Sequence, residues 1–250
     1  MWQLEGTTAV VSRAGSGIGQ ALALGLHGYG CRVALLDQDL GGLLHTLRLL
    51  APPLVDVDAS VATWQVDVAS AEAMRGVARD VVRRLGPVDL VINDAGLEQA
   101  MGLTVHGVVN STQAFLPFLL ERPEAAVVNV SGAFAVRGYT DSLRTELRRR
   151  TPSVRAVSVH PGGHIAGHTP GHGDGLATER PVSPGRAATT IIKGIQRRRE
   201  RIVLGREGGP SDLLSRLLAA SSSELALRRV VQGGSVPPPV PRPRRHADTC

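Results

Sequence analysis

Short apolar segments alternate with amphipathic segments along most of the chain, and this alternation restricts the folds open to it. Nearly continuous apolar runs predict strands at residues 7–11, 32–36, 63–66, 88–92, 126–130, 154–159 and 201–204. Apolar residues at helical spacing predict helices at residues 17–29, 40–50, 70–85, 104–120, 134–150 and 186–199. Strands that are apolar on both faces are typical of a parallel sheet covered by helices on each side. We therefore expect a doubly wound α/β fold.

The domain organisation follows from length and local composition. A chain of 250 residues with 42% hydrophobic residues is suited to one globular domain with a sizeable core. We predict that this domain spans residues 1–232, with a loop at 160–184 and a last helix at 211–229. Residues 233–250 are rich in proline and arginine and predict a disordered tail.

Composition also argues against several classes of partner. Cys31 and Cys250 are too few to indicate a disulfide framework or a cysteine-based metal cluster. The chain lacks an apolar run of about 18 residues and a recognisable signal segment, so we expect no membrane span and a cytoplasmic location. The net charge is +6, but the basic residues lie in helical segments and the tail with few aromatic residues among them, which argues against a nucleic-acid partner.

A glycine-rich segment joins the first predicted strand to the first predicted helix. In AVVSRAGSGIGQALA, residues 15, 17 and 19 are glycine. Glycine at such a junction lets the backbone approach a pyrophosphate, and the helix N-terminus offers free N–H groups. A glycine turn that only allows the strand and helix to pack remains the alternative.

Asp37 closes the second predicted strand, about twenty residues after the glycine turn. A carboxylate there accepts hydrogen bonds from the adenosine ribose of a dinucleotide and repels a 2′-phosphate. The sequence therefore favours NAD over NADP as cofactor.

Several segments in the same order resemble the classical short-chain dehydrogenase/reductase family, in a degenerate, internally shortened form. The family's TGxxxGIG motif is similar to residues 12–19, its NNAG motif to residues 93–96, and its PG turn to residues 161–162. The segments QVDVAS, GVVNSTQAFLPFLL, VVNVS and FAVRG also look like family sequence. The resemblance covers residues from about 4 to 205. It implies a Rossmann-like fold and an NAD(P)-dependent oxidoreductase acting on a secondary alcohol or ketone.

The resemblance also implies a set of cofactor-binding residues. Asp67 matches the aspartate that the family uses beside the adenine. The full set is Ser12, Arg13, Ser16, Gly17, Ile18, Gly19, Asp37, Asp67, Val68, Asn93, Ala95, Gly96, Pro161 and Gly162.

The family's proton-transfer residues are not found. Family members use a tyrosine whose pKa is lowered by a lysine four residues later. Here Tyr29 is followed at that spacing by Val33, and Tyr139 by Leu143. Lys193 is the single lysine, and Thr189 precedes it at the same spacing.

Two blocks of family sequence are missing around these positions. Residues 130–133 lead straight into the FAVRG segment, without the stretch that carries the family's tyrosine and lysine. The position of the family's serine is occupied by Gly132, next to Ser131. After Gly96 only residues 97–103 precede Thr104, which stands at the family's asparagine position. Asn110 does not match that asparagine, because it lies in the later GVVNST segment. We assign no catalytic residue. The resemblance implies that the stretch missing after Gly96 would include a helix that forms part of the family's dimer surface. Homo-oligomer formation is therefore in doubt.

Arg13 stands where the family has its first glycine. Glycine takes left-handed backbone angles that arginine does not favour, so we expect weakened cofactor binding. The alternative is that the arginine offers a cation to the pyrophosphate.

Two other readings of polar residues are weaker. His160, His164, His168 and His172 recur every four residues, but six glycines and prolines interrupt the segment, so a helical metal site is not favoured. Ser131, His160 and Asp141 suggest a hydrolase triad, yet Ser131 lies in no G-x-S-x-G elbow.

Two hypotheses about function follow from these observations. In the first, the chain is an NAD-dependent oxidoreductase of the family. In the second, it is a catalytically inactive relative that acts as a binding or interaction protein, or a shortened gene product.

Overall fold

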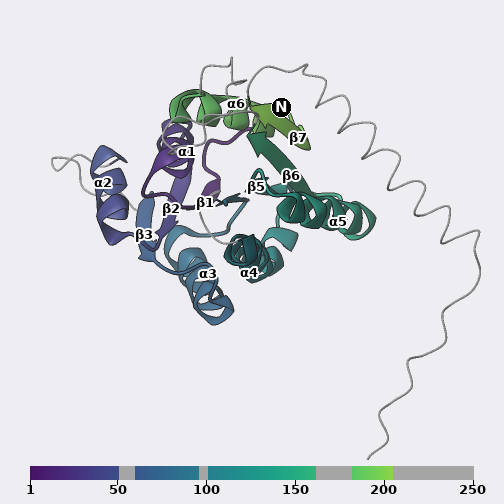
Figure 1. The fold of residues 1–250 in the computed structure, drawn as a ribbon, viewed down its shortest axis with the longest axis horizontal. Coiled ribbons are helices and arrows are strands. Elements are labelled where there is room, and N and C mark those ends of the chain that lie inside the picture. The colour runs from purple at the N-terminus through teal and green to yellow at the C-terminus, as the bar shows by residue number, and fades with distance from the viewer. Residues whose placement is uncertain (51–59, 96–100, 162–181, 205–250) are drawn as a thin grey trace, which may run out of the picture. The chain divides into compact units, whose positions relative to one another are not determined.

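The computed structural model describes residues 1–50, 60–95, 101–161 and 182–204 (Figure 1). The strands are β1 (Thr8–Ser12), β2 (Arg32–Asp37), β3 (Val61–Gln65), β4 (Leu90–Asp94), β5 (Ala125–Val130), β6 (Val154–Pro161) and β7 (Arg201–Leu204). The helices are α1 (Gly17–Gly28), α2 (Leu40–Leu50), α3 (Ala71–Leu85), α4 (Met101–Leu120), α5 (Phe134–Arg150) and α6 (Pro184–Gln196).

All seven strands form one parallel sheet in the order β3-β2-β1-β4-β5-β6-β7. The chain starts near the middle of the sheet, moves outward to β3, and then crosses back to β4 on the other side of β1. Val10 of β1 is paired with Ala34 of β2 on one side and with Val91 of β4 on the other. Because the sheet is parallel, all strands end at the same edge, and the switch between β1 and β4 opens a crevice there. The predicted doubly wound α/β fold is confirmed.

Two separate cores cover the two faces of the sheet. Helices α1, α2 and α6 pack on one face, around large buried residues such as Leu22, Leu43 and Ile191. Helices α3, α4 and α5 pack on the other face, where Met74 and Phe115 are buried. The result is a three-layer α/β/α arrangement, which Figure 1 shows in projection.

Local sequence signals explain where the helices begin and end. The Ser70 hydroxyl accepts a hydrogen bond from the Ala73 N–H (3.3 Å) and caps α3. Gly86, with φ of 85°, ends that helix. At the start of α2, the Asp39 carboxylate accepts a hydrogen bond from the Gly41 N–H (2.9 Å).

Several predicted boundaries differ from the structure. Strands β3 and β4 are displaced by one or two residues from the predicted ranges 63–66 and 88–92, and α6 begins two residues before the predicted start. Strand β6 continues through His160 to Pro161, so the predicted loop begins later than residue 160. Helix α4 begins at Met101, three residues earlier than predicted. Helix α6 ends at Gln196 rather than 199, because Arg198 takes a left-handed φ of 58° while its guanidinium holds both carboxylate oxygens of Glu124.

Several other predictions fall outside the described residues. These are the helix at 211–229, the boundary between residues 232 and 233, the proline-rich tail, and the histidines at 164, 168 and 172. Within the described ranges, no helix has the length and apolar character to cross a bilayer.

Candidate functional site

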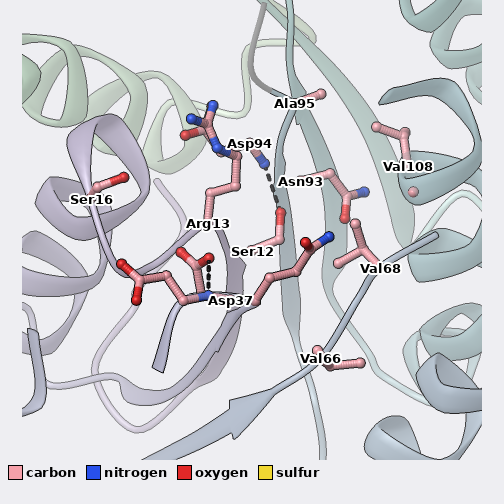
Figure 2. Close-up of a pocket in the computed structure, with 13 residues that line it drawn as sticks. Ser12, Arg13, Ser16, Asp37, Val66, Val68, Asn93, Asp94, Ala95 and Val108 are labelled. Carbon is pink, nitrogen blue, oxygen red and sulfur yellow. Dashed lines mark hydrogen bonds between the residues drawn. The ribbon is translucent and has the colours of Figure 1, made fainter. Parts of the chain in front are cut away.

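A cavity of about 250 Å³ opens at the carboxyl edge of the sheet, over the ends of β1, β2, β3 and β4 (Figure 2). It therefore lies at the topological switch point, where ligands of this fold class bind. In Figure 2, Asp37 and Asn93 lie on opposite sides of Ser12. The cavity is lined by Ser12, Arg13, Ser16, Asp37, Gln38, Asp39, Val66, Val68, Asn93, Asp94, Ala95, Gly107 and Val108.

The glycine turn, residues 13–16, forms one wall of the cavity and leads into α1. The first α-helical hydrogen bond runs from the Gln20 N–H to the Ser16 carbonyl (3.0 Å). The N–H groups of residues 17–19 precede that bond, so they lack partners within the helix. Helix α1 carries no acidic residue in its first turn. This end of the helix is thus suited to an anionic group.

Gly19 is required by the close approach of α1 to the glycine turn. A Cβ at residue 19 would lie 2.2 Å from the Arg13 carbonyl oxygen and 2.8 Å from the Ser12 carbonyl oxygen. Both are backbone atoms, so no side-chain movement could relieve the overlap. The third glycine of the motif therefore has a steric cause.

The carboxylate of Asp37 is fixed at the end of β2 by two backbone groups. It accepts a hydrogen bond from the Gly15 N–H (2.9 Å) through Oδ2 and one from the Asp39 N–H (3.1 Å) through Oδ1. Asp39 lines the cavity beside it. Two carboxylates thus stand at this end, an arrangement that attracts hydroxyl donors and repels a phosphate.

A buried hydrogen-bond chain fixes the amide of Asn93 at the opposite side of the cavity. The Thr140 hydroxyl donates to the Val136 carbonyl (2.7 Å), so it accepts from Asn129 Nδ2 (2.9 Å). Asn129 Oδ1 then accepts from Asn93 Nδ2 (2.8 Å). Among the described residues, Asn93 Oδ1 is left buried with no hydrogen-bond partner. A buried acceptor without a partner in a cavity-lining side chain is an observation that fits a polar ligand.

Contacts from α4 position the apolar wall. Asn110 Nδ2 donates to the carbonyls of Ala69 (2.7 Å) and Val68 (3.3 Å), which attaches the segment after β3 to the helix. A Cβ on Gly107 would lie 2.6 Å from Val68 Cγ2, so glycine allows this approach. Asn110 thus has a structural role here, consistent with its separation from the family's asparagine position.

The structure brings together half of the predicted cofactor-binding set. Ser12, Arg13, Ser16, Asp37, Val68, Asn93 and Ala95 line the cavity. Gly17, Ile18 and Gly19 form the adjoining first turn of α1. Asp67 is exposed beside the cavity wall and accepts hydrogen bonds from Gln38 Nε2 (2.9 Å) and the Ala69 N–H (2.8 Å). Pro161 ends β6, and Gly96 and Gly162 lie outside the described residues.

Sequence reasoning missed part of the lining. The missed residues are Gln38, Asp39, Val66, Asp94, Gly107 and Val108. Four of them are sequence neighbours of predicted residues, at the ends of β2, β3 and β4. Gly107 and Val108 come from the GVVNST segment. This segment resembles the family, so its position near the cofactor could have been predicted from the sequence.

The residues considered for catalysis lie apart from this cavity lining. Tyr139 is half-buried in α5, where burial raises the pKa of its phenol and a hydrogen bond with Thr112 partly offsets that effect. Leu143, four residues later, packs into the core under α5. Lys193 is exposed on α6, which covers the opposite face of the sheet.

The components of the hypothetical hydrolase triad have other partners. Ser131 Oγ accepts a hydrogen bond from the Ala133 N–H (3.1 Å), and Asp141 pairs with Arg144 (2.5 Å). His160 Nε2 lies 3.5 Å from Arg201 Nε. Over the described ranges, no group of three or more His, Cys, Asp or Glu side chains is placed to hold a metal ion.

Comparison of this chain with the sequences of known proteins agrees with this architecture. A family model described as short chain dehydrogenase matches residues 7–134, which include the glycine turn, Asp37 and the NNAG-like segment. The chain belongs to the short-chain dehydrogenase family. One relative in this family, the putative oxidoreductase SadH of Mycobacterium tuberculosis, is 33% identical, with 93% of this chain and 98% of that protein covered. The 1-deoxy-11-beta-hydroxypentalenate dehydrogenase of Streptomyces avermitilis is 31% identical over 75% of this chain and 77% of its own length.

Solved structures of short-chain dehydrogenases share the fold. One from Burkholderia phymatum, in complex with NAD, has a TM-score of 0.71 and 22% identity, and covers 90% of this chain and 97% of its own. The comparison with SadH spans 274 positions, more than the 250 residues of this chain. In the alignment, some residues of SadH therefore have no counterpart in this chain.

Proposed function

We propose that this chain is a nicotinamide-dinucleotide-binding short-chain dehydrogenase in which alcohol oxidation and ketone reduction are strongly impaired. The observation that carries the proposal is the direct passage from β5 into α5. Only Ser131, Gly132 and Ala133 separate Val130 from Phe134, the first residue of the helix. In the family resemblance, the tyrosine and lysine belong to the stretch that this connection lacks.

Features of the cavity support dinucleotide binding. The free N–H groups at the start of α1 suit a pyrophosphate, and the fixed carboxylate of Asp37 suits the ribose hydroxyls. Val66, Val68 and Val108 offer an apolar wall for the adenine. A bound nicotinamide ring would supply the hydride donor or acceptor, as NAD does for dehydrogenases in general. The Burkholderia structure, solved with NAD, supports the same assignment.

The proton-transfer part of the reaction lacks a suitable group. A phenol is a poor base near neutral pH unless a cation or hydrogen bonds lower its pKa, whereas burial raises the pKa of Tyr139. Lys193 and Tyr139 belong to helices on opposite faces of the sheet. The gaps against SadH are compatible with an internally shortened chain.

We expect NAD to bind at least about tenfold more tightly than NADP. A 2′-phosphate would meet the carboxylate of Asp37, which the Gly15 and Asp39 N–H groups hold in place. Isothermal titration with both dinucleotides measures the ratio, and Asp37→Asn should reduce it by removing the charge. Equal affinity of the unaltered protein for the two would contradict the NAD preference.

Replacing Arg13 with glycine should tighten NAD binding several-fold and raise the melting temperature. Arg13 has a left-handed φ of 51°, which costs a non-glycine residue about 1 kcal/mol. Glycine removes that cost and clears a side chain from the cavity wall. Fluorescence titration with NADH and a thermal melt test this. Weaker binding by Arg13→Gly would instead favour the guanidinium as a phosphate-binding cation.

A cytoplasmic location remains part of the proposal. The sequence has only two cysteines, which is compatible with a reducing compartment.

A further inference from the structure

The backbone N–H groups in the middle of the glycine turn are bound by β2. The Ala14 N–H donates to the Leu36 carbonyl (3.1 Å), and the Gly15 N–H donates to Asp37 Oδ2 (2.9 Å). Neither group is therefore available to a ligand, and among the backbone N–H groups of residues 14–19 those at the start of α1 remain for an anion.

The carbonyl groups of the same two residues are bound by side chains from α1 and α2. The Thr46 hydroxyl donates to the Ala14 carbonyl (2.8 Å), and Gln20 Nε2 lies 3.4 Å from the Gly15 carbonyl. Gln20 Nε2 also donates to Thr46 Oγ1 (2.8 Å), which joins the two side chains. Thr46 is fully buried. All four polar backbone groups of residues 14 and 15 thus have partners.

Helix α2 touches the glycine turn directly. A Cβ on Gly42 would lie 2.8 Å from the Gly15 carbonyl oxygen, and a Cβ on Gly15 would lie 3.1 Å from Gly42 Cα. Thr46 follows Gly42 by one helical turn on the same side of α2. Gly42, although glycine is unfavourable for helix formation, permits the contact that brings Thr46 to the turn.

We infer that Thr46 and Gln20 are positioning residues for phosphate binding, an inference that rests on the proposed dinucleotide function. They hold the carbonyls of the glycine turn away from the ligand, and the donors at the start of α1 remain aimed at the cavity. This support matters more than usual here, because Arg13 keeps a left-handed backbone that glycine would take without strain.

The inference predicts that Thr46→Val weakens NAD binding about tenfold. Valine has nearly the shape of threonine but leaves the Ala14 carbonyl and Gln20 Nε2 without their partner. Thr46→Ser restores the hydroxyl and should bind NAD within about twofold of the unaltered protein. The measurement is the dissociation constant for NAD by isothermal titration, with a thermal melt of each variant.

Thr8 offers a matched control at the start of β1, the opposite end of that strand from Ser12 and the cavity. It is also fully buried, and its hydroxyl donates to the Leu85 carbonyl (3.2 Å) and accepts from Arg32 Nε (3.0 Å). Thr8→Val should lower the melting temperature as Thr46→Val does, but leave the dissociation constant for NAD unchanged. Equal weakening by both variants would mean a general effect of lost buried hydrogen bonds and would overturn the inference.

A milder variant keeps the test decisive if Thr46→Val does not fold. Gln20 is half-buried, and Gln20→Met should fold and weaken NAD binding several-fold. If both variants fold and neither changes NAD binding, the positioning role is overturned while the proposed function stands. If Thr46→Val does not fold, unchanged NAD binding by Gln20→Met alone has the same consequence. No NAD binding by the unaltered protein overturns the proposed function and this inference with it.

Discussion

Purified protein supplied with NAD and a panel of secondary alcohols should form NADH at least about a hundredfold more slowly than an intact short-chain dehydrogenase. A positioned general acid or base contributes about 10²- to 10⁴-fold to such reactions. The connection from β5 to α5 contains no tyrosine or lysine, and Tyr139 is held by Thr112 with a raised pKa. The measurement is the initial rate of absorbance change at 340 nm with steroid, retinoid and diol substrates.

The control for this experiment is cofactor binding in the same preparation. Hydroxysteroid dehydrogenase from Escherichia coli, which shares the fold with a TM-score of 0.70, serves as the active comparison on its own substrate. Binding of NAD without turnover separates lost chemistry from lost folding. Ordinary turnover with any of these alcohols would refute the claim that the missing pair is needed.

Substitution of Gly19 by alanine should weaken NAD binding by about a hundredfold, since the loss of two hydrogen bonds to a charged group, at about 1.5 kcal/mol each, corresponds to that factor. The added Cβ would lie 2.2 Å from the Arg13 carbonyl oxygen, so α1 must shift away from the glycine turn. Overpacking of this kind also costs about 1–3 kcal/mol of stability. Titration with NAD and a thermal melt report the two effects.

Gly28 provides the matched control in the same helix. A Cβ there would meet no atom within 4 Å. Gly28→Ala should leave NAD binding unchanged and hold or slightly raise the melting temperature, because alanine favours the helix. If Gly19→Ala bound NAD as well as Gly28→Ala does, the role given to the start of α1 would be wrong.

The fold was predictable from the sequence because its signals are local. Apolar runs and helical periods fixed α2, α3, α5 and β7 at or within one residue of their observed bounds. Boundaries failed where distant contacts decide them, as at Arg198, which leaves the helical region while bound to Glu124. Nothing in the sequence around residue 198 indicates that partner, 74 residues away.

The candidate site was only partly predictable. The glycine turn and Asp37 carry a known motif, and both line the cavity. The partners of Asn93 and the anchoring of the turn by Thr46 depend on elements that meet only in the folded chain. Gly42 illustrates the limit: from the sequence alone, a glycine there only weakens the start of a helix, whereas the structure shows a backbone contact with Gly15.

A single-turnover reaction tests the central claim most directly. Protein saturated with NADH is mixed with a panel of ketones and aldehydes, and absorbance at 340 nm follows oxidation of the bound NADH. Enzymes typically turn over at about 10 s⁻¹, so loss of the proton donor predicts a rate constant below about 0.1 s⁻¹. Saturable NADH binding with a rate in that range is the result that we expect. Stoichiometric oxidation at about 10 s⁻¹ would show that this chain transfers hydride without the family's tyrosine and lysine.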